Sequence, residues 1–232
     1  MSGSGTRKGG KHRKRPAKPR SGVLLKALVI GAATMVAAAL GASQVSAMPD
    51  APPPPAAGSA LPMKVTAEDV PLTVDGQQIT RSFEGSIKLR VRDSSQTDRW
   101  KLKLRVTALH MVSEDERADG FGKLTIDHQN GNIKADSVLE LTGKHPPSWQ
   151  QTLSLAFTLS IEKRYHVPNT NRVEDPLVLT TTKPGKLVGK VDNFPPKGAK
   201  HELREPIDLV HPQYPNRTVA TIDGFPIRTE GA

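Results

Sequence analysis

Residues 83–92 read FEGSIKLRVR and residues 100–108 read WKLKLRVTA, and these two stretches decide the fold class. In both, apolar and polar residues alternate with the period of a β-strand that has one dry face and one wet face. The same alternation returns in the stretches 122–129, 132–142 and 149–162. Such alternation is typical of antiparallel sheets that pack one face on a core. The sequence therefore predicts an all-β protein.

Five strands joined by short loops form the predicted centre of the fold. They cover 81–92, 99–112, 122–129, 132–142 and 149–162. A hairpin must keep apolar residues opposite each other, because a slip of one residue turns every side chain to the other face. The pairs that satisfy this rule include Val91–Trp100, Ala108–Ile126, Ile126–Ala135 and Leu141–Trp149. Asn130-Gly131 is the strongest short hairpin signal, and it would join the third strand to the fourth.

Shorter strands complete the predicted sheet. The first covers 63–74 and changes parity near Glu68-Asp69, which indicates a β-bulge. The others cover 176–182, 186–192, 206–210 and 217–228. Segment 163–175 is predicted to be a long loop, and 201–205 (HELRE) a surface segment without zinc-binding spacing.

The length of the central strands indicates how the sheet closes. At about 12 residues they exceed the usual length of a strand, about 5 or 6. Long up-and-down strands with one apolar face predict an antiparallel meander that closes into a calycin-like barrel or a barrel-like sandwich. A membrane-spanning barrel would add aromatic girdles. The chain has only 5 Phe, 2 Trp and 2 Tyr, so this alternative is not favoured.

The first 47 residues have the pattern of a secretory signal peptide. A start rich in Lys and Arg precedes an apolar stretch from about Val23 to Leu40, and Val45 and Ala47 suit a signal-peptidase site. We expect cleavage after Ala47, a secreted or extracellular protein, and no membrane span after cleavage. The Pro-rich residues 48–62 predict a disordered spacer, and 63–232 a single all-β domain. The leader resembles those of exported proteins of high-GC Gram-positive bacteria, which implies a secreted protein.

Charge and cysteine content exclude further classes. The leader holds nine of the 33 Lys and Arg residues and no Asp or Glu, which leaves 24 basic against 23 acidic residues. A nucleic-acid partner is not predicted, because such proteins need a basic surface on the folded domain. The chain has no cysteine, so an exported domain must depend on its core rather than on disulfides.

Catalytic patterns are missing from the sequence. It holds no nucleophile elbow, phosphate loop or dinucleotide fingerprint. His110 and His128 both take the apolar parity, but the predicted register separates them by about 13 Å along the strands. The acidic loop 114–119 does not follow the calcium-loop pattern. We predict no catalytic residue, cofactor or metal.

The candidate ligand-binding residues are large inward-facing side chains and the rim of one long loop. They are Trp100, Leu102, Leu104, Leu155, Phe157, Tyr165 and His166. The leading hypothesis is a non-enzymatic barrel that binds a small apolar ligand or an extracellular partner. The alternatives are a structural or adhesive cell-envelope protein, and an isomerase-type or cyclase-type enzyme that uses the barrel cavity. Side chains usually fill the interiors of small barrels, so the apolar candidates could equally form a packed core.

Overall fold

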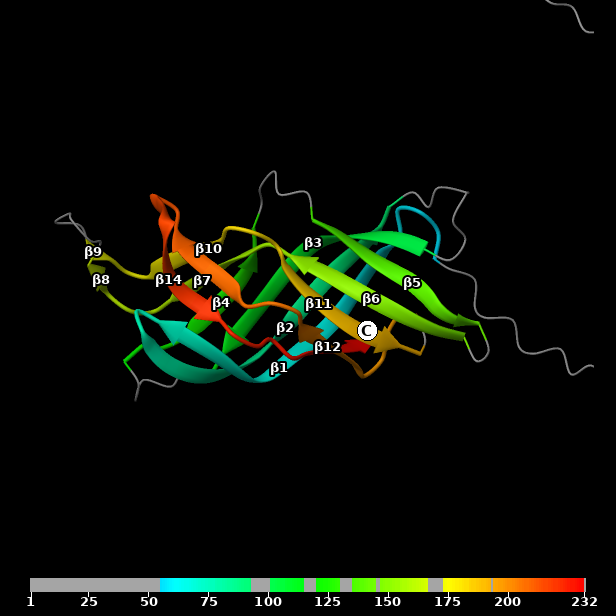
Figure 1. Cartoon of the computed structure of the whole chain (residues 1–232), viewed down its shortest axis with the longest axis horizontal. Helices are drawn as coiled ribbons and strands as arrows, with labels where there is room; N and C mark the ends of the chain where they lie inside the picture. Colours follow the sequence, from blue (N-terminus) through cyan, green and yellow to red (C-terminus); the bar gives the residue numbers. More distant parts are fainter. Residues whose placement is uncertain are drawn as a thin grey trace, which may run out of the picture. The chain divides into compact units, whose positions relative to one another are not determined.

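The computed structural model describes residues 55–92, 101–114, 120–129, 135–144, 147–166, 173–192 and 194–231. The regular elements in these ranges are all strands (Figure 1). Their bounds are β1 (Ala60–Val74), β2 (Gln77–Val91), β3 (Lys101–Ser113), β4 (Leu124–His128), β5 (Asp136–Lys144), β6 (Pro147–Leu155), β7 (Phe157–Ile161), β8 (Tyr165–His166), β9 (Val173–Glu174), β10 (Leu177–Thr181), β11 (Gly185–Val191), β12 (Ala199–Leu203), β13 (Ile207–His211), β14 (Tyr214–Ile222) and β15 (Ile227–Gly231).

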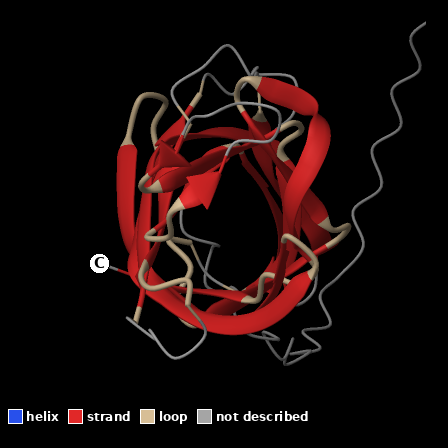
Figure 2. Cartoon of the chain, turned by 90° about the vertical axis from the view of Figure 1, so that its left-hand side faces the viewer, coloured by secondary structure: helices blue, strands red, loops and turns tan. Residues whose placement is uncertain are grey.

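The main sheet is a closed meander. Its 13 described strands are joined in the order β14-β13-β10-β7-β4-β3-β2-β1-β15-β12-β11-β6-β5, with further pairings β14–β1 and β3–β5. β4 and β5 pair with different parts of the same strand, β3. In the same way, two consecutive strands share each of the next positions around the sheet: β6/β7, β10/β11, β12/β13 and β14/β15. Each pair is thus one long strand with an interruption. Three uninterrupted strands and five interrupted ones make an eight-membered antiparallel ring (Figure 2). The predicted all-β barrel-like fold is confirmed.

β1 closes the ring. Its first half pairs with β15 at Met63–Ala67, and its second half pairs with β14 at Leu72–Val74. Between the halves the pairing with β2 shifts, and Asp69 takes a positive φ of 51°. The predicted bulge at Glu68-Asp69 is therefore confirmed. β1 begins at Ala60, three residues before the predicted start. Closure removes the unpaired sheet edges that favour aggregation.

Apolar side chains on the inner face pack into one core. Leu104, Met111, Leu155 and Ile227 are among the residues with almost no exposure. Near the interruption between β14 and β15, Phe225 enters this core. Its ring centroid lies 6.4 Å from that of Phe83 and 6.2 Å from that of Phe157. Burial of rings of this size contributes strongly to the stability of a chain that has no disulfides.

The predicted register of the first hairpin is wrong, although its apolar face is right. Val91 pairs with Leu104, four residues beyond Trp100, which lies outside the described residues. Even shifts preserve the side-chain parity, so the apolar pattern alone does not distinguish these registers. The pairing of Leu141 with Trp149 is confirmed.

The predicted Asn130-Gly131 hairpin is also wrong. β4 and β5 do not pair with each other; both run antiparallel to β3, at His110–Val112 and at Lys101–Arg105 respectively. The Asn-Gly dipeptide itself lies outside the described residues. Met111, not Ala108, lies opposite Ile126.

A β-bulge at Thr107 explains why His110 does not face the interior as predicted. Lys88 pairs with Ala108 and Leu89 pairs with Val106, so Thr107 is an extra residue in β3. A bulge of this kind reverses the parity of everything that follows it. The side chain of His110 is 59% exposed on the outer face.

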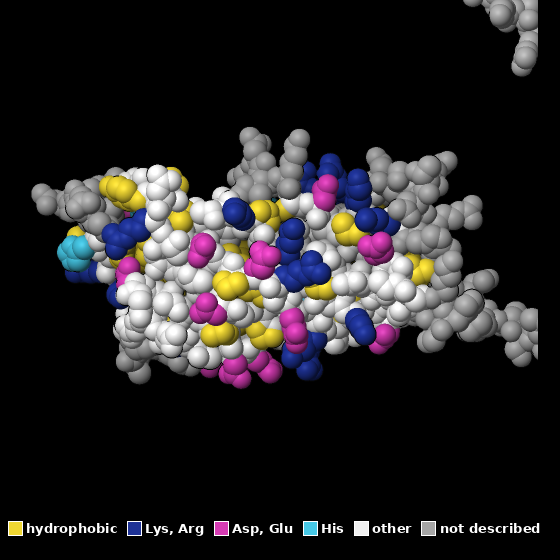
Figure 3. All heavy atoms as spheres, viewed as in Figure 1, with side chains coloured by type: hydrophobic (Ala, Val, Ile, Leu, Met, Phe, Trp, Pro, Cys, Tyr) yellow, Lys and Arg dark blue, Asp and Glu magenta, His cyan; other side chains and the backbone are white. Residues whose placement is uncertain are grey.

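The later part of the chain follows the predictions in outline. The predicted strands 176–182 and 186–192 correspond to β10 and β11, and 206–210 corresponds to β13. The predicted loop 163–175 contains a small sheet, β8–β9. The prediction of a surface segment at 201–205 is wrong, because Ala199–Leu203 is strand β12 and His201 is fully buried. On the outside, side chains of both charge signs are spread over the face shown in Figure 3.

Candidate functional site: a pocket at one end of the barrel

A pocket of about 280 Å³ lies where β8, β13 and β14 come together. These strands lie at the left-hand end of Figure 1. Tyr165, Tyr214 and Val219 belong to the core cluster or pack against it, so the pocket adjoins the core. The lining residues are Tyr165, His211, Gln213, Tyr214, Pro215, Asn216, Arg217 and Val219.

An irregular stretch of β14 forms one wall. Val210 pairs with Thr218, and the next pair is His211 with Tyr214. Residues 215–217 therefore have no partner in β13, and the chain bulges there. Pro215 suits this position because it has no N–H to give to a ladder. Bulges often re-aim side chains beside binding sites, and here the bulge brings Asn216 and Arg217 to the pocket.

His211 is held between two hydrogen bonds. Its Nε2 lies 2.8 Å from Oε2 of Glu174, and its Nδ1 accepts a hydrogen bond of 3.2 Å from the backbone N–H of Gln213. Nδ1 therefore has no hydrogen of its own, and Nε2–H donates to the carboxylate. The ring also lies 5.5 Å from the ring of Tyr214. Both nitrogens are occupied, so His211 fixes the positions of Glu174 and Tyr214 and is poorly placed to act as a base.

Tyr165 contributes a hydroxyl that stays protonated at neutral pH. Its side chain is buried, and burial raises the pKa of the phenol above its usual value. The negative charges of Asp75 and Glu174 raise this pKa further, and the positive charge of Arg217 lowers it. A phenol with a raised pKa remains a hydrogen-bond donor to whatever enters the pocket.

Arg217 gives the pocket its charge. Among the described lining residues it alone carries a formal charge, since His211 is neutral in the hydrogen-bonding arrangement above. Its guanidinium has no hydrogen-bond or ion-pair partner within the described parts of the chain. The carboxylate of Glu174 accepts a hydrogen bond from Nε2–H of His211.

The sequence-based candidates divide into two groups. Leu102 and Leu104 on β3, Leu155 at the end of β6 and Phe157 at the start of β7 are buried in the core. Trp100 lies outside the described residues. Tyr165 lines the pocket, whereas His166, the next residue, is exposed and is not part of the lining. Of the six candidates that the structure describes, only Tyr165 lines the pocket.

Sequence reasoning missed most of the pocket. His211, Tyr214 and Arg217 come from the stretch HPQYPNR at 211–217. Two prolines within five residues mark a strand that cannot form a complete ladder, and this was the available signal. The partner Glu174 lies 37 positions away from His211 in sequence, and no local pattern connects the two residues.

The barrel interior also contains one buried polar pair. Nε2 of His201 lies 3.0 Å from Oε1 of Gln151, and both residues are fully buried. Nδ1 of His201 and Nε2 of Gln151 have no hydrogen-bond partner. Burial lowers the pKa of His201 to about 4, against a smaller raising effect of the Ala199 and Ile227 backbone. The imidazole is therefore neutral at physiological pH.

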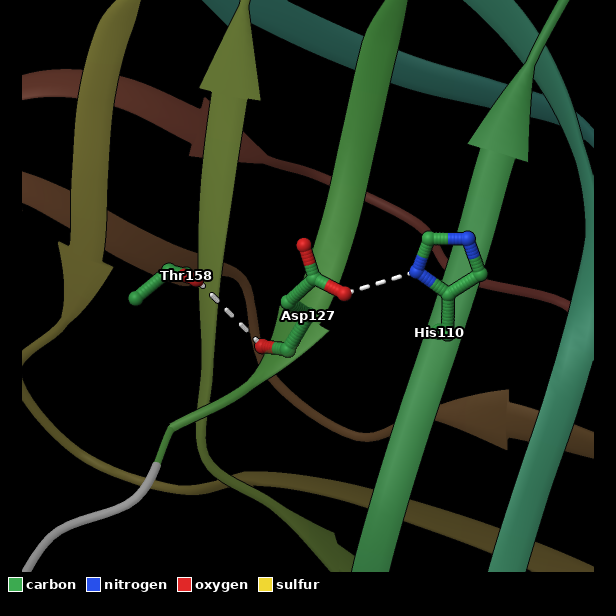
Figure 4. A network of polar contacts seen from close by, with 3 residues as sticks. All are labelled: His110, Asp127 and Thr158. Carbon is green, nitrogen blue, oxygen red and sulfur yellow. Dashed lines mark hydrogen bonds and ion pairs between the residues drawn. The ribbon is translucent and has the colours of Figure 1, made fainter.

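A second histidine–carboxylate contact lies on the outer face of the sheet. Nδ1 of His110 is 2.7 Å from Oδ1 of Asp127, and Thr158 donates a long hydrogen bond of 3.5 Å to the carbonyl of Asp127 (Figure 4). The side chains of His110 and Asp127 are 59% and 49% exposed. A cross-strand pair this exposed contributes little to stability. None of the pocket's lining residues belongs to this contact.

The described ranges hold no group of three His, Asp or Glu side chains arranged to bind a metal ion. Most of the acidic loop 114–119 lies outside those ranges. No helix suited to crossing a membrane occurs in the described part of the chain.

Comparison with known proteins supports the fold. The barrel is similar to the structure of DynF from the dynemicin biosynthesis pathway of Micromonospora chersina, with a TM-score of 0.60 and 16% sequence identity. The match covers 80% of this chain and 86% of DynF. At this identity the likeness shows a shared barrel-like fold. No protein-family model matches the chain, and no curated protein sequence matches it.

Proposed function

We propose that this protein is a secreted, non-enzymatic barrel that binds a small, largely apolar molecule in the end pocket. The pocket itself is the observation that carries the proposal. Its volume of about 280 Å³ exceeds the roughly 150 Å³ that is enough to hold benzene. Aromatic and aliphatic walls with a few polar groups are the usual composition of small-molecule sites. Tyr165, Tyr214 and Val219 provide the apolar walls here.

Secretion follows from the proposed processing of the chain. Residues 1–47 would be removed as a signal peptide, and the Pro-rich residues 48–59 would separate the new N-terminus from the barrel. β1 begins at Ala60, so the folded sheet starts near the end of the Pro-rich stretch, whose last proline, Pro62, pairs with Lys88 of β2. A closed barrel without cysteine is suited to an oxidising compartment, because it has no thiol to protect.

The surroundings of three histidines, His110, His201 and His211, favour binding over catalysis. A general base needs a nitrogen that can take a proton from a bound substrate. Both nitrogens of His211 are occupied, and His110 lies on the outer face. His201 is buried in the core beside Gln151. DynF, which shares the fold, comes from a biosynthesis pathway. In this chain the histidine among the described lining residues has both ring nitrogens in hydrogen bonds.

Binding can be tested with a fluorescent probe and a matched pair of variants. The full-length chain is expressed in a secreting bacterium, and the mass of the exported protein shows whether it begins at Met48. The probe N-phenyl-1-naphthylamine, a neutral aromatic molecule, is then titrated into the purified protein. Asn216→Trp fills the pocket from its exposed wall, and Thr218→Trp adds the same bulk at an exposed position outside the lining.

The two variants should behave differently. We expect the probe to bind the native protein and Thr218→Trp with similar affinity, and Asn216→Trp at least about tenfold more weakly, a loss of about 1.4 kcal/mol. Absence of binding to the native protein would overturn the carrier proposal. Equal binding by both variants would show that the probe uses another surface. Export of an uncleaved protein, or none, would overturn the proposed processing.

A further inference from the structure

We infer that the ligand of the end pocket is an acid, with an aromatic or apolar body against the two tyrosines and an anionic oxygen group on Arg217. This inference rests on the proposed function and specifies its ligand class. The interior candidates Leu104 and Phe157 would not recognise the anionic group of such a ligand, because their side chains offer only apolar contacts.

The charge balance of the pocket is the main argument. Arg217 is the one formally charged side chain among the described lining residues, and it has no partner there. Glu174 makes no ion pair with Arg217 within the described residues: its Oε2 accepts the Nε2–H of His211 at 2.8 Å, and its charge still acts on Tyr165. A guanidinium presents a planar set of donors that matches a carboxylate or a similar anion in a bidentate contact. In this proposal the ligand supplies the anion that completes this contact.

The other polar groups of the pocket agree with an anionic ligand. The Tyr165 hydroxyl is kept protonated, so it donates a hydrogen bond rather than repelling an anion. Asn216, on the same bulge as Arg217, carries an amide that can donate as well. Tyr214 and Pro215 provide the flat apolar surface beside them. Donors therefore lie next to an apolar wall, as an amphipathic acid requires.

The backbone accounts for the position of Arg217. Along the regular strands, cationic side chains such as Lys186 and Lys200 point away from the core into solvent. Residues 215–217 leave the β13 ladder, and this change places Arg217 at a pocket that adjoins the core. The partial burial of one side of the guanidinium by an aromatic ligand would strengthen its contact with an anion.

Two probes with the same body test the inference. N-phenyl-1-naphthylamine is neutral, and 1-anilinonaphthalene-8-sulfonate is the same molecule with a sulfonate. Both are titrated into the native protein, Arg217→Gln, Arg217→Lys and the control Arg228→Gln, which lies on β15 away from this pocket. Arg217 is exposed, so its replacement should not prevent folding, and a thermal melt of each variant checks this.

The expected result is a selective loss. Arg217→Gln should bind the sulfonate probe about tenfold more weakly and the neutral probe within about twofold of native, while Arg217→Lys should recover part of the loss. Arg228→Gln should match the native protein for both probes. If the native protein binds the neutral probe but Arg217→Gln leaves the affinity for the sulfonate probe unchanged, the proposal of an acidic ligand is refuted. The proposal that the barrel binds a small molecule in this pocket then still stands. If neither probe binds the native protein, both proposals fail.

Discussion

Acidification should destabilise the barrel through one buried residue, His201. Its imidazole lies in the core with Gln151 as its hydrogen-bond partner, and burial lowers its pKa to about 4. In the unfolded chain the same imidazole has an ordinary pKa near 6.5. Between these two values the unfolded chain binds a proton that the folded barrel does not bind. Stability is therefore lost as the pH falls through this window, and it is retained above 6.5.

The size of the effect follows from the two pKa values. Each unit of separation is worth about 1.4 kcal/mol, so lowering the pH from 7 to 4.5 should cost about 2 kcal/mol from His201 alone. Loss of this size is a substantial part of the total stability of an ordinary domain, about 5–15 kcal/mol. Solvent does not screen this effect, because the His201 side chain has no exposed surface.

Urea unfolding followed by tryptophan fluorescence, at pH 7 and at pH 4.5, measures this cost. His201→Gln removes the imidazole, so the free energy of unfolding of this variant should fall by about 2 kcal/mol less than that of the native protein. His166→Gln is the matched control, because it removes an exposed imidazole from β8 and should follow the native protein. Identical pH dependence in native and His201→Gln proteins would refute the reasoning. NMR titration of the native His201 ring gives a second, independent reading.

Three further substitutions test the packing and the pocket. Gly189→Ala would place a Cβ 2.7 Å from Cδ2 of the His201 ring, so urea unfolding should show a loss of about 1–3 kcal/mol, and an equal loss in the outward-facing Lys190→Ala would contradict this. Phe225→Ala removes a fully buried ring with two aromatic neighbours and should cost about 3–5 kcal/mol in the same assay; a loss below about 1 kcal/mol would show that the site is not tightly packed. Glu174→Ala releases the histidine that positions the pocket wall and should weaken N-phenyl-1-naphthylamine binding, whereas Glu174→Gln keeps an acceptor oxygen and should bind more nearly like the native protein; the reverse order would contradict the positioning role.

The alternation over the long strands is sufficient to predict an all-β, barrel-like sheet, but it does not distinguish a closed barrel from a barrel-like sandwich. Residues such as Ile87, Leu89 and Leu104 share a parity that only a sheet can bury together. The alternation does not distinguish registers that differ by an even number of residues. It therefore predicts Val91 opposite Trp100, whereas the structure pairs Val91 with Leu104. The alternation also does not show that Thr107 is an extra residue in β3 with no partner in β2. This extra residue turns the side chain of His110 to the outer face.

The pocket was less predictable than the fold. Tyr165 is predicted because the polar loop 163–175, with one aromatic residue, could line a barrel mouth. His201 was missed because the stretch AKHEL is short and lies between prolines and glycines, although its alternation of Ala199, His201 and Leu203 is that of a strand. The contact of His211 with Glu174 depends on tertiary structure that brings β13 to β9, and this is beyond any local pattern.

The position of the pocket follows from the way a closed barrel is stabilised. Side chains such as Leu104, Leu155 and Phe157 have no exposed surface, so a ligand that reached them would have to displace part of the core. The end pocket leaves the core intact because it lies where the ladder is already incomplete. The bulge at 215–217 is such a place, because these residues make no pairs with β13 while β14 still closes the ring against β1 through Val74 and Ala220. Changes at Asn216 or Arg217 can therefore alter what is bound without disturbing the pairs that hold the barrel closed.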